Sequence, residues 1–493
     1  MRKFFILFLA VGILLSFNSC EDDKNTGDPI DVDEQTGEPE EVSPLTPEEH
    51  KTNIASVGVE LVGEMDDLAK SDATEAAINL FTLMEGEEEE EYSDSYKSAV
   101  AFSTLKVLSD FGQNEATVFD IMRNLRTLNA TLPDTPIEEE YKDEFAGTWE
   151  WDASSEDFEQ TASGDQAIFK FPASASSESN NAVFTVTAFD WKEISGDLTD
   201  DELEEVPVSL AANLKVDGNT AMEISFSGDY NEKGIPQSID VSLKVATYEF
   251  TTSVTNDFTD ASMESTMKHG DKQILKLSAG VNGDFSEANI EDNTYTELDT
   301  SDYGYCVEWN DDYSECIDYE YDVWEETYVD VENILESSYG FMEVLNLRIG
   351  GEVDAKNMIL AEKDLDWDKK ADEESNVDAE VEAMNEYMDF YAAYVDENKR
   401  IATVEFIKVR SDESWEHCEW NYDTQEYENC ADYYDYWVEG NFIFGDDSKV
   451  NAETYFEDGF KSFIDELNTF IRDMNSEYSD YGMDMEPIDY DGK

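Results

Sequence analysis

The middle of the chain carries a long run of stretches in which apolar and polar residues alternate. From about Phe145 the apolar residues change from a helical spacing to a period of two, which is the pattern of strands. Short turns separate the stretches, and no helical pattern lies between them. We therefore predict an antiparallel meander with one buried and one wetted face. The clearest stretches are Val208 to Val216, Ala221 to Ser227, Ile239 to Val245, Tyr248 to Val254, Met263 to Lys268 and Ile274 to Val281.

Helical patterns flank this run on both sides. Thr46 and Glu49 have the spacing of a capping box, with Pro47 at the first helical position. Further helices are predicted at about Ala73 to Met84, Ser95 to Phe111, Thr117 to Leu125, Asn376 to Glu397 and Ala452 to Met474. Further strands are predicted at Val344 to Val353, Ile401 to Val409 and Tyr434 to Phe444. The fold class is therefore α+β, a curved antiparallel β-meander flanked by N-terminal and C-terminal helices.

The charge of the chain excludes one class of partner. There are 120 Asp and Glu residues against 31 Lys and Arg, which gives a formal net charge of −89. A surface of this sign repels phosphate backbones, so nucleic-acid binding is excluded. The content of 40% hydrophobic and 12% aromatic residues is enough for a folded core. Because cations relieve self-repulsion, we expect a saline or divalent-rich medium, with calcium as the candidate cofactor.

The N-terminus has the pattern of a bacterial lipoprotein signal. A basic start is followed by an apolar run from Phe4 to Phe17, and then by Ser19 and Cys20. In such signals the cysteine is acylated and becomes the new N-terminus. A transmembrane anchor would need roughly 18 or more apolar residues, more than this run has. A cleaved secretory signal without lipid is the alternative, but the other four cysteines form two local pairs and leave Cys20 as the odd one.

This segment resembles the signals of uncharacterised surface lipoproteins of the Bacteroidota. It departs from the usual lipoprotein pattern at Phe17, where Leu is commonest, and at Ser19, where Gly or Ala is. In the lipoproteins it resembles, an acid-rich stretch after the lipidated cysteine directs export to the outer face of the outer membrane. Glu21, Asp22 and Asp23 match that stretch. The resemblance implies a lipid-anchored, surface-exposed outer-membrane protein, whose partners are the membrane and an unknown extracellular ligand or outer-membrane protein.

These features divide the chain into six predicted segments. A proline-containing acidic stretch without apolar periodicity after Cys20 is typical of a flexible tether. The segments are the signal peptide at 1–19, the tether at 20–45, a helical segment at 46–140, the β-meander at 141–300, an α+β segment with two cysteine hairpins at 301–474 and a loose tail at 475–493.

Two similar segments each contain a cysteine pair around a tryptophan and a turn rich in Asn and Asp. A hairpin can bring such positions within disulfide distance, and an exported chain meets an oxidising compartment. We predict disulfides between Cys306 and Cys316 and between Cys418 and Cys430, closing two hairpins. The acids and aromatics around them suit either a cation or sugar site or a sheet with one packed and one solvated face. The cysteine spacings lack the CxxC pairs of a zinc site.

The sequence offers few groups for catalysis or metal binding. Three histidines, His50, His269 and His417, are each predicted to be solvated surface residues, and no catalytic motif is present. One run begins like an EF-hand loop, with Asp364, Asp366 and Asp368, but it lacks the glycine and the glutamate that such a loop needs. Irregular calcium binding there and solvated turn acids are the two alternatives.

Three functions are consistent with these observations. The leading hypothesis is a non-catalytic surface lipoprotein that binds an extracellular ligand or partner. A second is a carbohydrate-active hydrolase that uses two carboxylates. The third is an acyl-chain carrier, because a curved antiparallel sheet with covering helices is similar to periplasmic lipoprotein carriers, whose concave apolar face holds acyl chains. That similarity predicts apolar side chains between the sheet and the helices.

Overall fold

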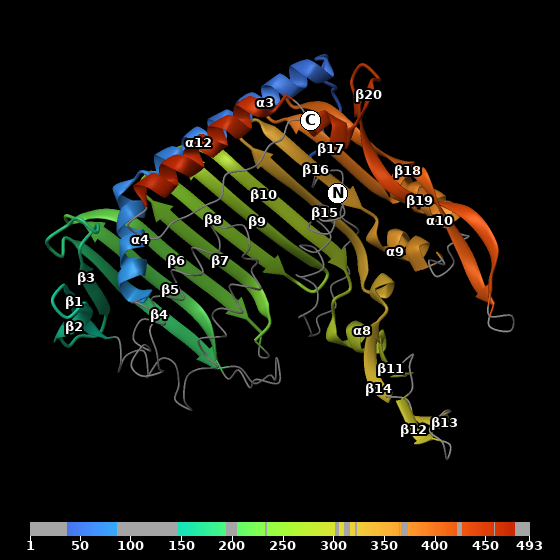
Figure 1. Cartoon of the computed structure of the whole chain (residues 1–493). Coiled ribbons are helices and arrows are strands. Elements are labelled where there is room, and N and C mark those ends of the chain that lie inside the picture. The colour runs from blue at the N-terminus through green and yellow to red at the C-terminus, as the bar shows by residue number, and fades with distance from the viewer. Residues whose placement is uncertain are drawn as a thin grey trace.

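One sheet of 16 strands organises the computed structural model of the chain (Figure 1). The structure describes residues 37–85, 146–193, 205–231, 234–300, 305–309, 316–320, 323–363, 365, 373–421, 426–457 and 459–478. Neighbouring strands in the sheet mostly follow each other in the sequence, as in a meander. The predicted α+β fold with an antiparallel meander and helices at both ends is therefore confirmed.

The order of the strands across the sheet differs from their order in the sequence at two places. The edge strand β2 lies outside β1, and β10 pairs directly with β15. Only β1 and β3 run parallel among these neighbours. The strands are β2 (Asp157–Ala162), β1 (Gly147–Asp152), β3 (Ala167–Phe171), β4 (Ala182–Glu193), β5 (Glu205–Val216), β6 (Asn219–Tyr230), β7 (Pro236–Val245), β8 (Tyr248–Asn256), β9 (Asp260–His269), β10 (Lys272–Gly283), β15 (Leu335–Val344), β16 (Leu347–Val353), β17 (Met388–Tyr394), β18 (Lys399–Asn421), β19 (Glu426–Phe444) and β20 (Lys449–Asn451).

Tight turns keep the meander in register. Between β5 and β6, Asp217 and Gly218 have φ values of 51° and 82°. Two consecutive left-handed residues are the requirement of a type I′ turn, whose twist matches that of the strands it joins. Val216 consequently pairs with Asn219, directly across this turn.

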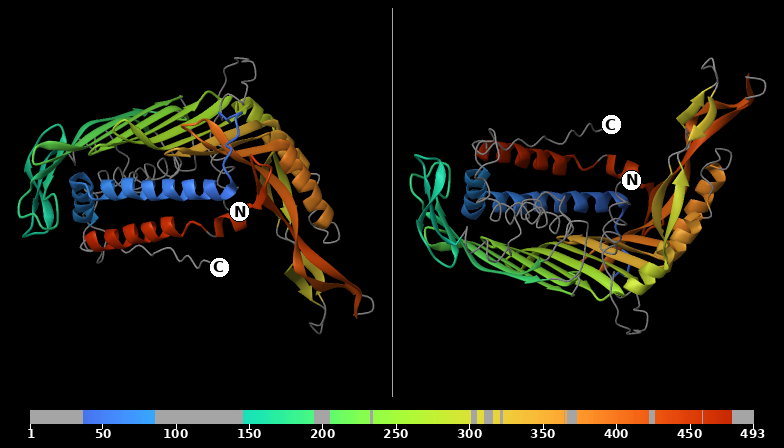
Figure 2. Two further views of the ribbon diagram at one scale, coloured as in Figure 1. Left: turned by 90° about the horizontal axis from the view of Figure 1, so that it is seen from above. Right: turned by 90° about the horizontal axis from the view of Figure 1, so that it is seen from below.

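The sheet is curved, and three of the described helices lie on its concave side (Figure 2). They are α3 (Pro47–Ala69), α4 (Asp72–Glu85) and α12 (Lys461–Glu477). We call the sheet face toward these helices the inner face and the other the outer face. The capping box at the start of α3 is confirmed, because the Thr46 side chain accepts from the Glu49 amide and Glu49 accepts from the Thr46 amide. The predicted second helix is confirmed as α4.

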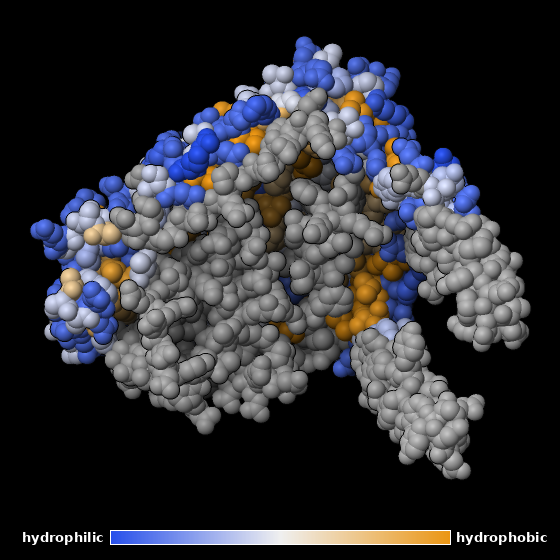
Figure 3. Space-filling model, in the orientation of Figure 1, coloured by the Kyte–Doolittle hydropathy of each residue, from blue (hydrophilic) through white to orange (hydrophobic). Residues whose placement is uncertain are grey.

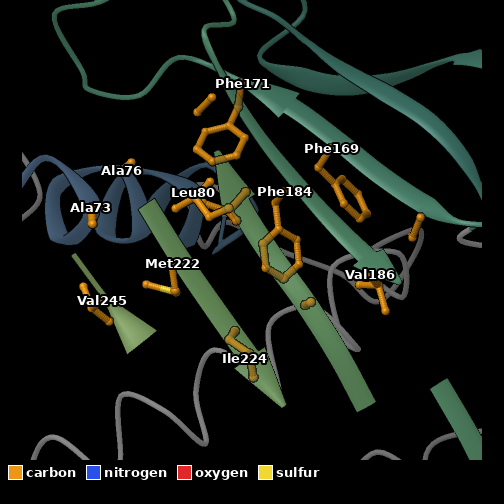
Figure 4. Packing of buried hydrophobic residues seen from close by; sticks show 14 of the residues in the cluster. Ala73, Ala76, Leu80, Phe169, Phe171, Phe184, Val186, Met222, Ile224 and Val245 are labelled. Atoms are coloured by element: carbon orange, nitrogen blue, oxygen red, sulfur yellow. The ribbon is translucent and has the colours of Figure 1, made fainter. Parts of the chain in front are cut away.

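The largest apolar core forms where α4 lies on the inner face of β3 to β7 (Figure 4). Leu80 of α4 is 1% exposed, and Phe184 and Leu214 opposite it are equally buried. Ala73 and Ala76 let the helix approach the sheet closely, because their side chains are small. Burying a leucine of this kind contributes about 1.5–3 kcal/mol relative to leaving it exposed.

The C-terminal helices pack on the far end of the sheet. The predicted helix from Asn376 to Glu397 is correct only in its first half, because α10 (Glu373–Tyr387) ends where β17 begins. The spacing fits a helical stripe at Met388, Tyr391 and Val395, but the alternation in Met388–Tyr394 also fits a strand. Backbone pairing of this segment with β16 makes it a strand. A shorter helix, α9 (Ala355–Lys363), packs beside α10 around Val353, Met358 and Ala383.

The predicted closing helix is divided into two. It consists of α11 (Ala452–Glu457) and α12, with Gly459 at a left-handed φ of 87° between them. The α12 helix then runs beside α3, with the Phe463 ring against Gly58. A β-carbon at Gly58 would lie 2.6 Å from that ring, so the glycine permits the close approach. The Tyr478 hydroxyl donates to the Ala69 carbonyl at the other end of this helix pair.

Two small sheets project from the body between β10 and β15 (Figures 1 and 2). One pairs β11 (Thr294–Thr300) with β14 (Val323–Val329), and the other pairs β12 (Tyr305–Trp309) with β13 (Cys316–Glu320). They are flanked by α8 (Glu287–Asp292) and the 3-10 helix η1 (Val331–Asn333). Because β10 and β15 pair across this insertion, the segments predicted as 141–300 and 301–474 contribute to one continuous sheet.

The structure does not support the predicted disulfide-closed hairpins. In the first hairpin, Cys306 pairs with Tyr319 and Cys316 pairs with Trp309. Three residues along a strand span roughly 10 Å, which exceeds the usual separation of disulfide-bonded α-carbons. In the second hairpin, His417 pairs with Ala431 and Glu419 with Glu428, so Cys418 and Cys430 lie within the bulge between those pairs. The spacing alone could not reveal which register each hairpin adopts.

The last part of the predicted tether lies against the sheet. Val42 forms a parallel bridge with Arg400, whose backbone amide donates to the Glu41 carbonyl over 2.8 Å. The Arg348 side chain donates from Nη1 to the Gly37 carbonyl over 3.0 Å. Residues 37–45 are therefore held by β16 and β18 before α3 begins.

Candidate functional site

A row of mostly apolar side chains crosses the inner face beside the three helices. Backbone pairing places one residue from each of seven neighbouring strands, β6 to β10 with β15 and β16, in this row. We call these residues the inner band: Phe226, Val241, Thr252, Ser265, Leu277, Met342 and Ile349. Hydrophobic atoms are visible in the hollow below α3 and α12 (Figure 3).

The band is incompletely covered by the described part of the chain. Ile349 is 49% exposed, and most other members are half-buried. In a sheet with one packed face, side chains on that face should be buried, so partial exposure there departs from the pattern of a filled core. Larger exposed apolar patches mark binding surfaces in soluble proteins. The inner band is consequently the candidate ligand-binding surface.

Small residues lie beside the band at its β10 to β16 end. The next inner-face row pairs Ala279 with Gly340, and Gly340 with Gly351. At Gly351 the Phe390 ring occupies the space that a larger side chain would fill, because a β-carbon there would lie 2.3 Å from it. At the centre of the band, the Thr252 and Ser265 hydroxyls hydrogen-bond each other over 2.8 Å. These two polar groups are thereby satisfied within an otherwise apolar surface.

A polar network fixes α3 over the turns that join β7 to β8 and β9 to β10, beside the centre of the band. Glu64 of α3 accepts from three partners on the sheet. Its Oε2 lies 2.7 Å from His269 Nδ1 and 3.1 Å from the Tyr248 hydroxyl, and its Oε1 lies 2.6 Å from Lys272 Nζ. The His269 and Tyr248 rings stack with centroids 4.2 Å apart. Because helix and sheet are joined here by charge-assisted hydrogen bonds, α3 has a defined position over the band.

The network also sets the protonation of its members. Burial alone would raise the pKa of Glu64, but the hydrogen bonds from Lys272, His269 and Tyr248 together hold that pKa below its usual value. Burial and the nearby Glu64 carboxylate raise the pKa of Tyr248. Glu64 is thus ionised and Tyr248 is protonated at neutral pH. The network therefore suits a structural contact between α3 and the sheet, since Glu64 accepts the protons that its partners donate.

The least exposed carboxylates in the described ion pairs are held by cations. Glu343 is 5% exposed and pairs with Arg348, while Glu332 is 12% exposed and pairs with Lys363. Arg348 also donates to Glu343 from Nε over 2.9 Å, and its guanidinium lies 4.6 Å from the centroid of the Phe341 ring. These contacts stabilise the fold.

The residues singled out from the sequence are not brought together at the inner band. Cys20, Glu21, Asp22 and Asp23 lie outside the described residues, as do Asp364, Asp366 and Asp368. The hairpin cysteines lie on β12, β13, β18 and β19. Within the described ranges, no group of three or more His, Cys, Asp or Glu side chains is arranged to hold a metal ion.

The solvated position predicted for His50 is wrong. Its side chain is fully buried, with Nδ1 2.8 Å from the Tyr394 hydroxyl and the ring stacked on Phe444. Burial lowers the pKa of His50, an effect that the Glu49 and Asp446 carboxylates partly oppose. His269 lies in the network described above, and His417 lies on β18. The glutamates around His50 in the sequence predicted a solvated helix turn. The prediction failed because the partners of His50 lie on distant C-terminal strands and leave no local signal.

The inner band was not found by sequence analysis, although its signal is present. Each member sits in an alternating stretch, but only the register across seven strands brings the members into one row. Comparisons with protein-family models, with curated proteins and with solved structures found no match. For the residues that the structure describes, no helix is both long and apolar enough to cross a membrane.

Proposed function

We propose that this chain is a lipid-anchored outer-membrane lipoprotein whose folded body binds a long-chain apolar ligand on the inner band without transforming it. The observation that carries the proposal is the incomplete burial of apolar side chains on the face that the helices cover. Burying such surface against a ligand gains about 25 cal/mol per Å² of apolar area. A long hydrocarbon chain matches a row that crosses seven strands.

Ligand binding can be tested with the full chain carrying Cys20→Ser, which removes the proposed lipid and keeps every described residue. Fluorescence of cis-parinaric acid would report binding, and displacement by unlabelled acyl compounds of increasing length would report the class of ligand. We expect saturable binding that strengthens with chain length. Absence of saturable binding of any long-chain compound would contradict the proposal.

Ile349 provides the matched variant, because it is a band residue that is already half exposed. Ile349→Asn should weaken binding without unfolding the protein. Leu360→Asn on α9 is the control, since Leu360 is similarly exposed at 42% but lies outside the band. Circular dichroism of both variants would verify that the fold is retained. Equal loss of binding in both variants would place the ligand elsewhere.

The proposed lipid anchor depends on residues at the N-terminus and can be tested separately. Metabolic labelling with an alkyne-bearing palmitate analogue should label the wild type and not Cys20→Ser. Replacing Glu21, Asp22 and Asp23 by alanine should keep the label but protect the protein from protease added to intact cells. Labelling of Cys20→Ser at the wild-type level would contradict lipidation at this position.

We also propose that Cys418 and Cys430 form a disulfide. Both residues lie in the bulge between β18 and β19, so the register of this hairpin does not separate them along the strands as it separates Cys306 from Cys316. Thiol alkylation with and without prior reduction, followed by mass spectrometry, would test it. The expected result is protection of Cys418 and Cys430 until reduction, and alkylation of both in unreduced protein would overturn it.

A further inference from the structure

Two hydrogen-bond donors are buried without partners near one end of the inner band. They are the indole nitrogen Nε1 of Trp191, near the end of β4, and the hydroxyl of Tyr230, at the end of β6. Within the described part of the chain neither atom has a hydrogen-bond partner. Tyr230 is 1% exposed. Buried donors are nearly always paired in native proteins, so each of these requires an explanation.

Both side chains belong to the inner face. Trp191 packs edge-on against Phe189, with centroids 5.2 Å apart, and Phe189 faces Leu210, which in turn pairs with Phe226 of the inner band. Tyr230 folds back along β6, because its ring covers Gly228 so closely that a β-carbon there would lie 2.5 Å from it. One strand, β5, lies between the two strand ends, and Lys192 Nζ reaches across it to donate to the Tyr230 carbonyl over 2.5 Å.

The chemistry of these donors defines the group that could satisfy them. An indole N–H can only donate, so Trp191 needs an acceptor. Burial raises the pKa of Tyr230, which keeps its hydroxyl protonated and able to donate. A carboxylate is disfavoured by the net charge of −89 that the chain carries. An uncharged carbonyl oxygen, as in an ester or amide, accepts two hydrogen bonds without bringing in charge.

We propose that Trp191 and Tyr230 form a head-group site for the ester or amide carbonyl of a long-chain acyl compound, whose hydrocarbon chain lies along the inner band. This inference rests on the proposed function and adds the class of head group and its position. The site is at the β4 and β6 end of the band, away from the Glu64 network. Phe189 and Leu210 connect it to the band through an apolar surface.

The test compares two ligands with one chain length in the full chain carrying Cys20→Ser. Displacement of cis-parinaric acid by 1-monopalmitoylglycerol, an uncharged ester, is measured beside displacement by palmitate at pH 8. The ester should bind more tightly than the acid. Tyr230→Phe and Trp191→Phe should each weaken ester binding about fivefold, the loss of one neutral hydrogen bond. Both should leave palmitate binding within twofold of the wild type.

The control is Tyr339→Phe, a partly buried tyrosine on the outer face whose ring covers Gly280. It should bind both ligands like the wild type. A ¹³C label on the ester carbonyl gives a second readout, since its chemical shift should change on Tyr230→Phe and not on Tyr339→Phe. Ester binding unaffected by Tyr230→Phe and Trp191→Phe would overturn the head-group site while leaving band binding intact. If neither ligand binds the wild type, the proposed function itself fails.

Discussion

The imidazole Nδ1 of His50 lies 2.8 Å from the hydroxyl oxygen of Tyr394, within the contact between α3 and β17. The Asn53 side chain donates to the same hydroxyl over 3.1 Å. The first turn of α3 is therefore joined to a strand that lies 344 residues later in the chain.

Stability should depend on the protonation of His50. Burial lowers its pKa in the folded protein below the ordinary value of 6.5, so acidification charges this histidine first in the unfolded chain. Protonation of His50 does not affect the free energy of unfolding at pH 8, and it lowers this free energy as the pH falls below 6.5. The slope cannot exceed about 1.4 kcal/mol per pH unit for one proton.

Urea unfolding from pH 8 to pH 5 would measure this effect by comparing the wild type with His50→Gln. The difference in the free energy of unfolding between the two proteins should shrink on acidification, because only the wild type has the titrating group. Carboxylate titration is common to both proteins and cancels. A difference that is constant with pH would rule out this role of His50.

Glu64→Gln should destabilise the protein by about 1–3 kcal/mol, because a buried acceptor of three hydrogen bonds loses its charge. Glu60→Gln is the matched control. Glu60 lies one turn earlier on α3 and binds the same Lys272 over 2.8 Å, but it is 54% exposed against 12% for Glu64. The control should change stability by no more than about 1 kcal/mol. Urea midpoints at pH 7 would separate the two, and equal effects would show that burial of the network is unimportant.

Arg348→Lys should release the N-terminal segment. A lysine cannot donate to Glu343 and to the Gly37 carbonyl at once in the fork geometry of arginine. Limited proteolysis followed by mass spectrometry should show faster cleavage within residues 37–45 than in the wild type. Lys461→Arg is the control, since its exposed pair with Asp465 lies within α12 and includes no residue of the segment. Cleavage at the wild-type rate would mean that Arg348 does not hold this segment.

Leu80→Ala should cost about 2–5 kcal/mol through the cavity left in the core beneath α4. Leu360→Ala removes the same atoms from a side chain that is 42% exposed, and should change stability by less than about 1 kcal/mol. Thermal or urea unfolding measures both. Similar losses in the two variants would contradict the assignment of this core.

The local elements could be predicted from sequence because their signals are local. Alternation with tight turns located β5 to β10, and the Thr46 capping box located the start of α3. Features of the fold that depend on pairing between distant parts of the chain could not be predicted. The joining of β10 to β15 across the insertion, the end of α10 at Tyr387 and the burial of His50 all depend on partners far away in sequence. The inner band depends in the same way on register across seven strands.

The contacts of α3 have a consequence for the order in which this chain can fold. Its N-terminal end meets Tyr394 and Tyr455, and its C-terminal end meets Tyr478. During synthesis α3 emerges before all of these partners, and only its contacts through Glu64 to β8, β9 and β10 can form when the middle of the chain is complete. The two ends of α3 can therefore be fixed only when nearly the whole chain is present, and closure of contacts at such separations is intrinsically slow.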